Sequence, residues 1–424
     1  MRIITVNDLK NKNISDEFFG VIEYDNDASI DAIIAGVKNS GDKFLIEISN
    51  KFSDGNFNSA DDFIVTNDEI INAYNTVGQE YVNKITIAKN NILDFAARQL
   101  ECIKNLEYKT GDSVLGHKTV PLDRVLCYVP GGNYPLPSSC LMTVIPAKAA
   151  GVNEIYLTSP RIKPETIVAA HIAGADKIYK LGGAQAISAF AFGTETIKEV
   201  NKIVGPGNRY VTYAKKHVYG KVDIDFLAGP SEVLIAADES ADAKLIAADM
   251  LAQSEHDKDA RSYLVTTSAE LANNVQNYAK EFLDSLQTRD IAQIAFDKSF
   301  AVIADSIDEI IEITNKRAPE HLEIMLKNPK CYTDKFKNYG SMFIGSNCAE
   351  VFGDYVSGTN HVLPTNMASK YTGGLSVFDF IKILTYQEID KNYAHELSKT
   401  ASYIAQKEGL MAHKLASDLR GENG

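Results

Sequence analysis

A short pattern that occurs twice constrains the fold of this chain most strongly: "AAGVNEIYL" around Gly151 and "IAGADKIYKL" around Gly174. Each copy runs from small apolar residues through a glycine into an apolar, β-rich stretch. This order is expected where a helix ends at a C-cap glycine and a strand follows. Strands that alternate with helices in this way form parallel sheets. We therefore predict an α/β domain with a β-α-β-α-β succession over about residues 129–228.

A second α/β region is predicted to follow the first. "EVLIAAD" and "SYLVTT" are predicted strands, and "SADAKLIAADMLAQSEHD" between them is a predicted helix. This domain is expected to continue to about residue 375 and to recruit the segment before residue 129. Residues 79–107 have apolar side chains at helical spacing, and the tail from residue 376 is predicted to be helical and to join subunits. With 424 residues, the chain is long enough for two such cores.

Composition narrows the functional class. The net charge of −13 argues against nucleic acid as a partner, because binding to phosphates needs clustered Lys and Arg. The 5 cysteines are scattered without a Cys-x-x-Cys pair, which indicates neither a disulfide framework nor a thiolate zinc site. No apolar run approaches the length of a membrane span, and the first residues lack the apolar core of a signal peptide. We expect a cytoplasmic protein that acts on small molecules, with no membrane partner.

The stretch "RAPEHLEI" places a glutamate beside a histidine directly after a proline. Pro319 suits the first position of a helix, so Glu320 and His321 are predicted to lie in the first helical turn. The positive end of the helix dipole would then keep the carboxylate ionised and the imidazole neutral, which gives two bases side by side. Ordinary stabilisation of a helix start by an acidic residue is the competing interpretation.

Candidate metal ligands occur in three places. Gln253 and His256 are three residues apart on a predicted helix, so their side chains project from one face. Asp354 and His361 lie in the turn-rich stretch "GDYVSGTNHVLPT", and His413 lies near the C-terminus. Such nitrogen and oxygen ligands suit zinc, manganese or cobalt. Solvated polar residues on a helix face and a surface turn are the alternative interpretation.

Glycine-containing turns follow four apolar runs: "YVPGG", "LGGAQAI", "IVGPGNRY" and "FLAGPSE". Backbone amides in such turns can hold the phosphates of a dinucleotide. The Gly-x-Gly-x-x-Gly fingerprint fails, however, because Tyr210 stands at the third glycine position after Gly205 and Gly207. From the turns alone, a nucleotide site and simple strand-to-helix connections remain equally open.

Taken together and in order, ten segments resemble the histidinol dehydrogenase family. They are "PLDRVLCYVPGG", "LMTVIPAKAAGV", "LGGAQAI", "VGPGNRYV", "DFLAGPSE", "LAQSEHD", "APEHLE", "GDYVSGTNHVLPT", "GGLSVFDF" and "EGLMAHK". They extend from about residue 120 to the C-terminus, and "GDKFLIEISNKFSDG" upstream is similar more loosely. The resemblance implies a zinc enzyme that oxidises L-histidinol to L-histidine through bound histidinaldehyde, with two NAD⁺ reduced.

The resemblance also implies roles for individual residues. The implied metal ligands are Gln253, His256, Asp354 and His413, and the implied catalytic pair is Glu320 as activator of water and His321 as base. The implied substrate-binding residues are Ser231, Gln253, His256, His321, Asp354, His361, Glu408 and His413. The implied cofactor-binding residues are Tyr128, Gln185 and Asn208. Leu136 stands where many family members have tyrosine. At this position the cofactor contacts of the loop are therefore expected to differ from those of the family.

The implied architecture has two incomplete Rossmann-like domains in an intertwined homodimer that shares its sites between subunits. The expected parts are an N-terminal arm (1–20), a domain with the metal and catalytic residues (21–128 with 229–375), a cofactor domain (129–228) and a C-terminal helical dimerisation domain (376–424). Three alternatives compete with this function. They are a dehydrogenase for another alcohol, a zinc hydrolase in which Glu320 activates water, and a binding protein without catalysis.

Overall fold

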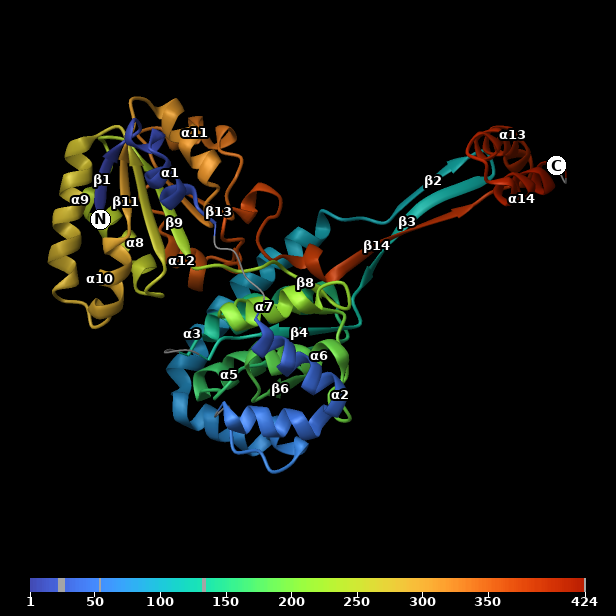
Figure 1. The fold of residues 1–424 in the computed structure, drawn as a ribbon, viewed down its shortest axis with the longest axis horizontal. Helices are drawn as coiled ribbons and strands as arrows, with labels where there is room; N and C mark the ends of the chain where they lie inside the picture. Colours follow the sequence, from blue (N-terminus) through green and yellow to red (C-terminus); the bar gives the residue numbers. More distant parts are fainter. Residues whose placement is uncertain (22–26, 53–54, 132–134, 423–424) are drawn as a thin grey trace.

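Parallel strands form two separate sheets, and a third, antiparallel sheet forms an arm that projects from them (Figure 1). These features come from a computed structural model that describes residues 1–21, 27–52, 55–131 and 135–422. Both parallel sheets carry helices on their two faces, which confirms the predicted α/β class. None of the helices in these ranges is long and apolar enough to cross a membrane.

The five-stranded sheet has the order β6-β5-β4-β7-β8, with every pair parallel. Its elements are β4 (Arg124–Tyr128), α4 (Pro137–Ala150), β5 (Glu154–Thr158), α5 (Pro164–Ala173), β6 (Lys177–Tyr179), α6 (Gly183–Phe192), β7 (Lys202–Val204), α7 (Arg209–Val218) and β8 (Asp223–Ile224). The repeated pattern is confirmed, because α4 and α5 end at Gly151 and Gly174 in the left-handed conformation, with φ of 88° and 94°. Glycine adopts this conformation without a steric cost.

The six-stranded sheet has the order β1-β11-β10-β9-β12-β13 and is also parallel throughout. Its elements are β1 (Arg2–Thr5), α1 (Lys12–Phe19), β9 (Glu232–Ala237), α8 (Ala243–Ser254), β10 (Arg261–Thr266), α9 (Ala269–Leu283), α10 (Arg289–Asp297), β11 (Phe300–Ile303), α11 (Ile307–Arg317), β12 (His321–Met325), β13 (Ser341–Ile344) and α12 (Glu350–Tyr355). Successive β9 side chains alternate between the two faces: Val233 and Ile235 pack under α8, and Leu234 packs on the side of α1 and α11.

The N-terminal segment differs from the predicted arm. Strand β1 pairs in parallel with β11 as an edge strand of the six-stranded sheet. Phe18 of α1 is fully buried between Tyr263 and Phe300, with ring centroids 4.9 Å and 5.6 Å apart. Residues 1–20 are therefore an integral part of this lobe, because their apolar side chains complete its core.

The predicted place of residues 21–128 is wrong for most of this segment. Helices α2 (Ala28–Lys51) and α3 (Asn67–Glu101) pack on the five-stranded lobe, and β4 is a central strand of that sheet. The physical reason lies in α4, which is apolar on nearly all sides and is buried along most of its length. A helix of this kind needs a further layer of structure over it, and α3 supplies that layer.

The arm combines β14 (Ile381–Glu388), β3 (Ser113–Pro121) and β2 (Leu106–Thr110) with two helices at its tip, α13 (Lys391–Lys407) and α14 (Met411–Glu422) (Figure 1). The prediction that the tail is helical from residue 376 is therefore wrong for β14. Eight residues of β14 pair with β3 in antiparallel register. Short 3-10 helices lie at Asp8–Lys10, Ala60–Phe63, Pro329–Cys331, Thr333–Lys335, Ala368–Lys370 and Val377–Phe380.

Candidate active site

Glu320 and His321 lie at the amino end of a strand, so the prediction of a helix start is wrong. Helix α11 ends at Arg317, Ala318 adopts the left-handed conformation with φ of 52°, and Pro319 follows. His321 is then the first residue of β12, whose five residues are all buried beside β9. A proline occurs just after a helix as readily as at its first position, and the local sequence does not separate the two.

The main chain of one neighbouring residue contacts both side chains. The backbone N–H of Glu232, the first residue of β9, donates to Oε2 of Glu320 at 2.8 Å. The backbone carbonyl of Glu232 lies 3.1 Å from Nδ1 of His321. A carbonyl oxygen only accepts, so Nδ1 carries the hydrogen and donates it. Nε2 has no hydrogen-bond partner within the described part of the chain, and it is the nitrogen left to exchange a proton.

Three carboxyl groups surround the His321 imidazole. Nδ1 lies 3.6 Å from Glu320 Oε2 and 3.7 Å from Glu350 Oε1, and Nε2 lies 3.6 Å from Asp354 Oδ1. The side chains of His321, Glu320 and Glu350 are at most 7% exposed, and that of Asp354 is 13% exposed. This cluster is therefore acidic and nearly removed from water.

Burial sets the proton affinities in the cluster. Removal from water raises the pKa of Glu320 to about 8 and raises that of Glu350 as well. Burial alone would lower the pKa of His321, but the carboxylates of Glu350, Glu320 and Asp354 raise it well above its ordinary value. Both directions are the reverse of the helix-dipole prediction for Glu320 and His321, because no helix begins here. Desolvation governs the pKa of Glu320, and the neighbouring carboxylates govern that of His321.

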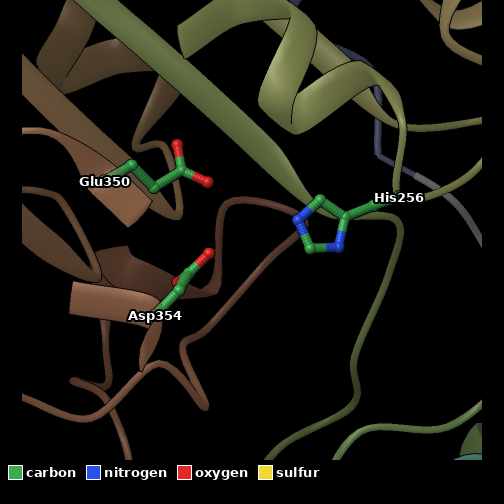
Figure 2. A group of neighbouring side chains, drawn as sticks. All are labelled: His256, Glu350 and Asp354. Carbon is green, nitrogen blue, oxygen red and sulfur yellow. The ribbon is translucent and has the colours of Figure 1, made fainter. Parts of the chain in front are cut away.

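Metal-ligating side chains gather next to His321. One ligand atom from each of His256, Glu350 and Asp354 lies within 4.8 Å of the others. Figure 2 shows the two carboxyl groups close together, with the imidazole of His256 facing them from the loop after α8. Gln253, in the last turn of α8, is fully buried, and neither of its amide atoms has a hydrogen-bond partner within the described ranges. A buried polar group of this kind needs a partner that the protein itself does not supply.

Two further predicted substrate contacts lie at the edge of the cluster. Nδ1 of His361 lies 2.8 Å from the carbonyl oxygen of Asp354 and therefore donates to it. Its Nε2 lies 3.5 Å from the hydroxyl of Ser139, at the start of α4 in the other lobe. Burial lowers the pKa of His361, as it does that of His256. Ser231 directly precedes β9, and its carbonyl accepts from the N–H of Arg261.

Glu408 and His413 are the predicted site residues that the fold does not bring to this cluster. Glu408 caps α13, and His413 lies on α14. Both helices form the tip of the arm, far from α8 and α12 within the same chain (Figure 1).

Glu350 and Glu232 are the residues of this site that the sequence reasoning missed. Glu350 and Asp354 are four residues apart on α12, so they lie on one face of the helix, and this spacing is visible in "AEVFGDY". Glu232 gave no such signal, because its contacts with the catalytic pair are made by its main chain. Such contacts depend on strand register, which only the folded sheet defines.

The predicted cofactor residues line one cavity of about 490 Å³ on the five-stranded lobe. Tyr128 ends β4, Gln185 follows β6 on α6, and Asn208 caps α7 after β7. The cavity thus lies at the carboxyl ends of the strands. Strand β4 stands between β5 and β7, where the strand order reverses, and α/β sheets bind ligands at this point.

The other residues that line this cavity come from α2 and its C-cap, from the loops after β4 and β5, and from the first turns of α6 and α7: Ser29, Ile30, Ile33, Phe52, Pro130, Gly131, Pro160, Arg161, Gly183, Ala184 and Tyr210. Leu136, the point of difference from the family, precedes α4 and packs against the apolar cluster of that lobe. Residues 132–134 of the same loop, including the second glycine of "YVPGG", lie outside the described residues.

A buried acid–base cluster on one lobe and a cavity at the strand ends of another are typical of an α/β enzyme. The model of the histidinol dehydrogenase family matches residues 22–421. The chain therefore belongs to the histidinol dehydrogenase family, whose members are oxidoreductases of histidine biosynthesis.

Individual relatives agree over nearly the whole chain. The histidinol dehydrogenase of Methanocaldococcus jannaschii is 47% identical, over 90% of this chain and 89% of the relative. That of Clostridium acetobutylicum is 46% identical with the same coverage of 90% and 89%. The crystal structure of histidinol dehydrogenase from Elizabethkingia anophelis has a TM-score of 0.92 and 36% identity, and the match covers 99% of this chain and 98% of that one.

Proposed function

We propose that the chain oxidises L-histidinol to L-histidine through bound histidinaldehyde, in two successive oxidations that each reduce one NAD⁺. The observation that carries this proposal is the buried cluster around His321, in a chain whose relatives are histidinol dehydrogenases. Its imidazole has one nitrogen fixed by a main-chain carbonyl, and the other has no hydrogen-bond partner among the described residues.

The charge of the cluster fits a cationic substrate. Glu320, Glu350 and Asp354 place three acids around one imidazole, in a site with little access to water. Buried carboxyl groups in excess of cations are costly unless positive charge is added. Histidinol carries an ammonium group and an imidazole, so it supplies such charge, and a simple diol does not.

The residues also fit a metal ion. His256, Asp354 and Gln253 offer nitrogen and oxygen ligands without a thiolate, and the unpartnered amide of Gln253 supports a ligand there. His413 of a second subunit is the fourth proposed ligand. When bound, a zinc ion in this place would orient the substrate through its imidazole nitrogen and through its amino nitrogen once the ammonium group has lost a proton.

His321 is proposed as the base of both oxidations. The positive charge of the substrate and of a bound metal would offset the carboxylates that raise the pKa of His321. Nε2, then unprotonated, takes the hydroxyl proton of the alcohol while the hydride leaves the adjacent carbon. The nicotinamide cofactor, when bound, accepts that hydride. The aldehyde must then gain water before a second hydride can leave, and Glu320 is proposed to take a proton from this water. A carboxyl group whose pKa is raised to about 8 is a stronger base, once ionised, than an ordinary glutamate.

Substrate and cofactor are proposed to bind from different lobes. Ser231 and His361 would contact the substrate beside the cluster, and Glu408 of a second subunit would face its cationic groups. The cofactor would occupy the cavity lined by Tyr128, Gln185 and Asn208. Ser139 at the start of α4 lies 3.5 Å from Nε2 of His361, which links the five-stranded lobe with the edge of the cluster.

A homodimer that shares its sites completes the proposal. The arm exposes apolar side chains along its strands and at its tip: Leu106, Tyr108, Ile383, Leu384, Leu397, Tyr403, Ile404, Leu410, Met411 and Leu415. A second exposed apolar set lies on α3 and α12, next to Asp354: Ile87, Leu93, Phe95, Val351, Phe352, Tyr355 and Val356. Asn91 Nδ2 donates to the carbonyl of Val356 at 2.8 Å, which joins the two helices. The arm of a second copy would cover this set and bring its His413 to the cluster.

The decisive experiment measures NADH formation from L-histidinol, with and without prior chelation of metal. We expect activity with histidinol and two NADH for each substrate, little activity with simple diols, and loss of activity after chelation. Circular dichroism should stay unchanged on chelation, because both α/β cores are apolar and form without metal. Absence of NADH with histidinol would overturn the proposal, and a large loss of helical signal on chelation would make the metal structural.

A further inference from the structure

Glu232 and Arg317 form a buried ion pair directly beneath the catalytic pair. Both side chains are 3% exposed, and Nη2 of Arg317 donates to Oε2 of Glu232. The same Nη2 lies 3.3 Å from the hydroxyl of Tyr263, and the guanidinium lies 4.9 Å from the centroid of the Tyr263 ring. Nε and Nη1 of Arg317 have no hydrogen-bond partner among the residues that the structure describes. Glu232 is therefore the main source of negative charge for this arginine.

Stability alone does not explain such a pair. Desolvation of two charges costs about as much as their attraction returns, and apolar side chains of similar volume often serve equally well in a core. Tyr263 contacts the guanidinium of Arg317, and the charges of Arg261 and His321 also act on Glu232. A buried ion pair does, however, fix the relative position of the two backbone segments that carry it.

The two segments are the ones that carry the proposed chemistry. Glu232 begins β9, and its N–H and C=O hold Glu320 and His321 respectively. Arg317 ends α11, three residues before Glu320. The ion pair thus ties the start of β9 to the turn that delivers both catalytic side chains.

We propose that Glu232 and Arg317 are positioning residues: their ion pair holds the main chain of Glu232 where it fixes the Nδ1–H tautomer of His321 and the rotamer of Glu320. This inference rests on the proposed function, since it assigns a task to residues that act through His321 and Glu320. Loss of the pair frees the start of β9 to shift, and Nε2 of His321 then no longer points steadily at the substrate. Catalysis falls, whereas groups that bind the substrate elsewhere keep their places.

The test uses Arg317→Met, Arg317→Lys and the double variant Glu232→Gln with Arg317→Met. The double variant leaves no unpaired charge in the core, so it is the one expected to fold best. We expect kcat with histidinol to fall about tenfold or more in Arg317→Met and in the double variant, because small displacements of reacting groups cost this much. KM for histidinol and for NAD⁺ should change by less than about threefold. Arg317→Lys keeps the charge and should recover part of kcat.

A matched control separates positioning from general damage. Arg124 and Glu154 form another ion pair, at the amino ends of β4 and β5, away from the cavity and the cluster. Arg124→Met combined with Glu154→Gln should leave kcat unchanged at equal folded fraction, as measured by circular dichroism.

A background that lacks His321 gives the sharpest readout. In His321→Asn, the addition of Arg317→Met should slow the first hydride transfer by less than about twofold, because the group being positioned is already gone. Two results would overturn the positioning role. One is that Arg317→Met slows His321→Asn by the same factor as it slows the wild type, and the other is that folded Arg317→Met keeps the wild-type kcat. Neither result touches the proposed function, which instead fails if wild-type protein forms no NADH or if His321→Asn keeps full activity.

Discussion

Glu320 and His321 share one main-chain partner yet differ in what they can do. His321 presents a free Nε2, whereas Glu320 is held through Oε2 and has a raised pKa. We therefore predict that Glu320→Gln slows oxidation of histidinaldehyde on the order of a hundredfold or more but slows oxidation of histidinol little. His321→Asn should slow both. The measurement is the single-turnover rate of NADH formation with each substrate, and equal losses for Glu320→Gln in both steps would remove the division of labour.

The raised pKa of Glu320 has a consequence for stability in the metal-free protein. The folded state keeps this proton up to about pH 8, whereas the unfolded state releases it near its ordinary pKa of 4.5. The folded state therefore binds more protons in that window, and its free energy of unfolding falls as pH rises from about 4.5 to about 8. Glu320→Gln removes this contribution, which is on the order of a few kcal/mol.

Urea unfolding in the presence of a chelator, at pH 5.5 and at pH 8, measures the effect. The wild type should lose more stability between the two values than Glu320→Gln does, and at pH 8 the variant should be the more stable. The same change with pH in both proteins would show that Glu320 does not hold its proton in the fold.

At this scale the sequence predicts the identity of the site residues better than their surroundings. The structure brings His256 and Asp354 together. Helix α8 ends at Ser254, however, so His256 does not share a helix face with Gln253 as the spacing predicts. The environment of Glu320 is the opposite of the prediction, because Pro319 follows one helix and does not start another. Burial depends on which strands become neighbours, and local sequence does not specify that.

Among the elements, the two C-cap glycines are the clearest link between sequence and fold. Gly174 has φ of 94°, and a methyl group added at its Cα would meet no clash, since its nearest neighbour would be Lys148 at 3.8 Å. Gly174→Ala should therefore destabilise the protein by about 1 kcal/mol through backbone strain alone. The matched control is Gly373→Ala, which has space and no left-handed backbone, and should stay within roughly 0.5 kcal/mol of the wild type.

The midpoint of urea unfolding, followed by circular dichroism, compares the two glycine variants. Equal midpoints for Gly174→Ala and the wild type would mean that α5 can end in another way.

Strands and helices inside each lobe are predictable from local patterns, whereas the partners of long helices are not. β9, α8 and β10 lie within the stretches that predict them, although α8 ends at Ser254 and leaves His256 in the loop that follows. For helix α3, in contrast, the sequence predicts the wrong sheet as a partner, because an amphipathic stripe shows only that one face is buried. The prediction of helix for β14 fails because its pairing with β3 joins residues more than two hundred positions apart. Such long-range pairing has no local signal.

In the molecule as a whole, His413 lies on an arm that does not reach the His321 cluster of the same chain. The proposal that two subunits share each site can therefore be tested. His256→Ala and His413→Ala should each be inactive as homodimers. When the two are unfolded and refolded together, one site of each mixed dimer lacks both ligands and the other is complete. Random pairing then restores about a quarter of wild-type activity.

The control for this experiment is each variant refolded alone, and mass measurement confirms that mixed dimers form. No recovery in the presence of mixed dimers would mean that His413 acts within its own chain or is not a ligand.

The proposed function assigns cofactor and substrate to two different sheets, and this division would govern the timing of turnover. The cavity at the carboxyl ends of the five-stranded sheet and the cluster at the amino ends of β9 and β12 have no strand in common. Under the proposed function, spent coenzyme would leave and fresh coenzyme would enter while the half-oxidised amino aldehyde stayed held by the other lobe. The reactive intermediate need never diffuse into bulk water, and the pace of the cycle would depend on how fast the coenzyme is exchanged.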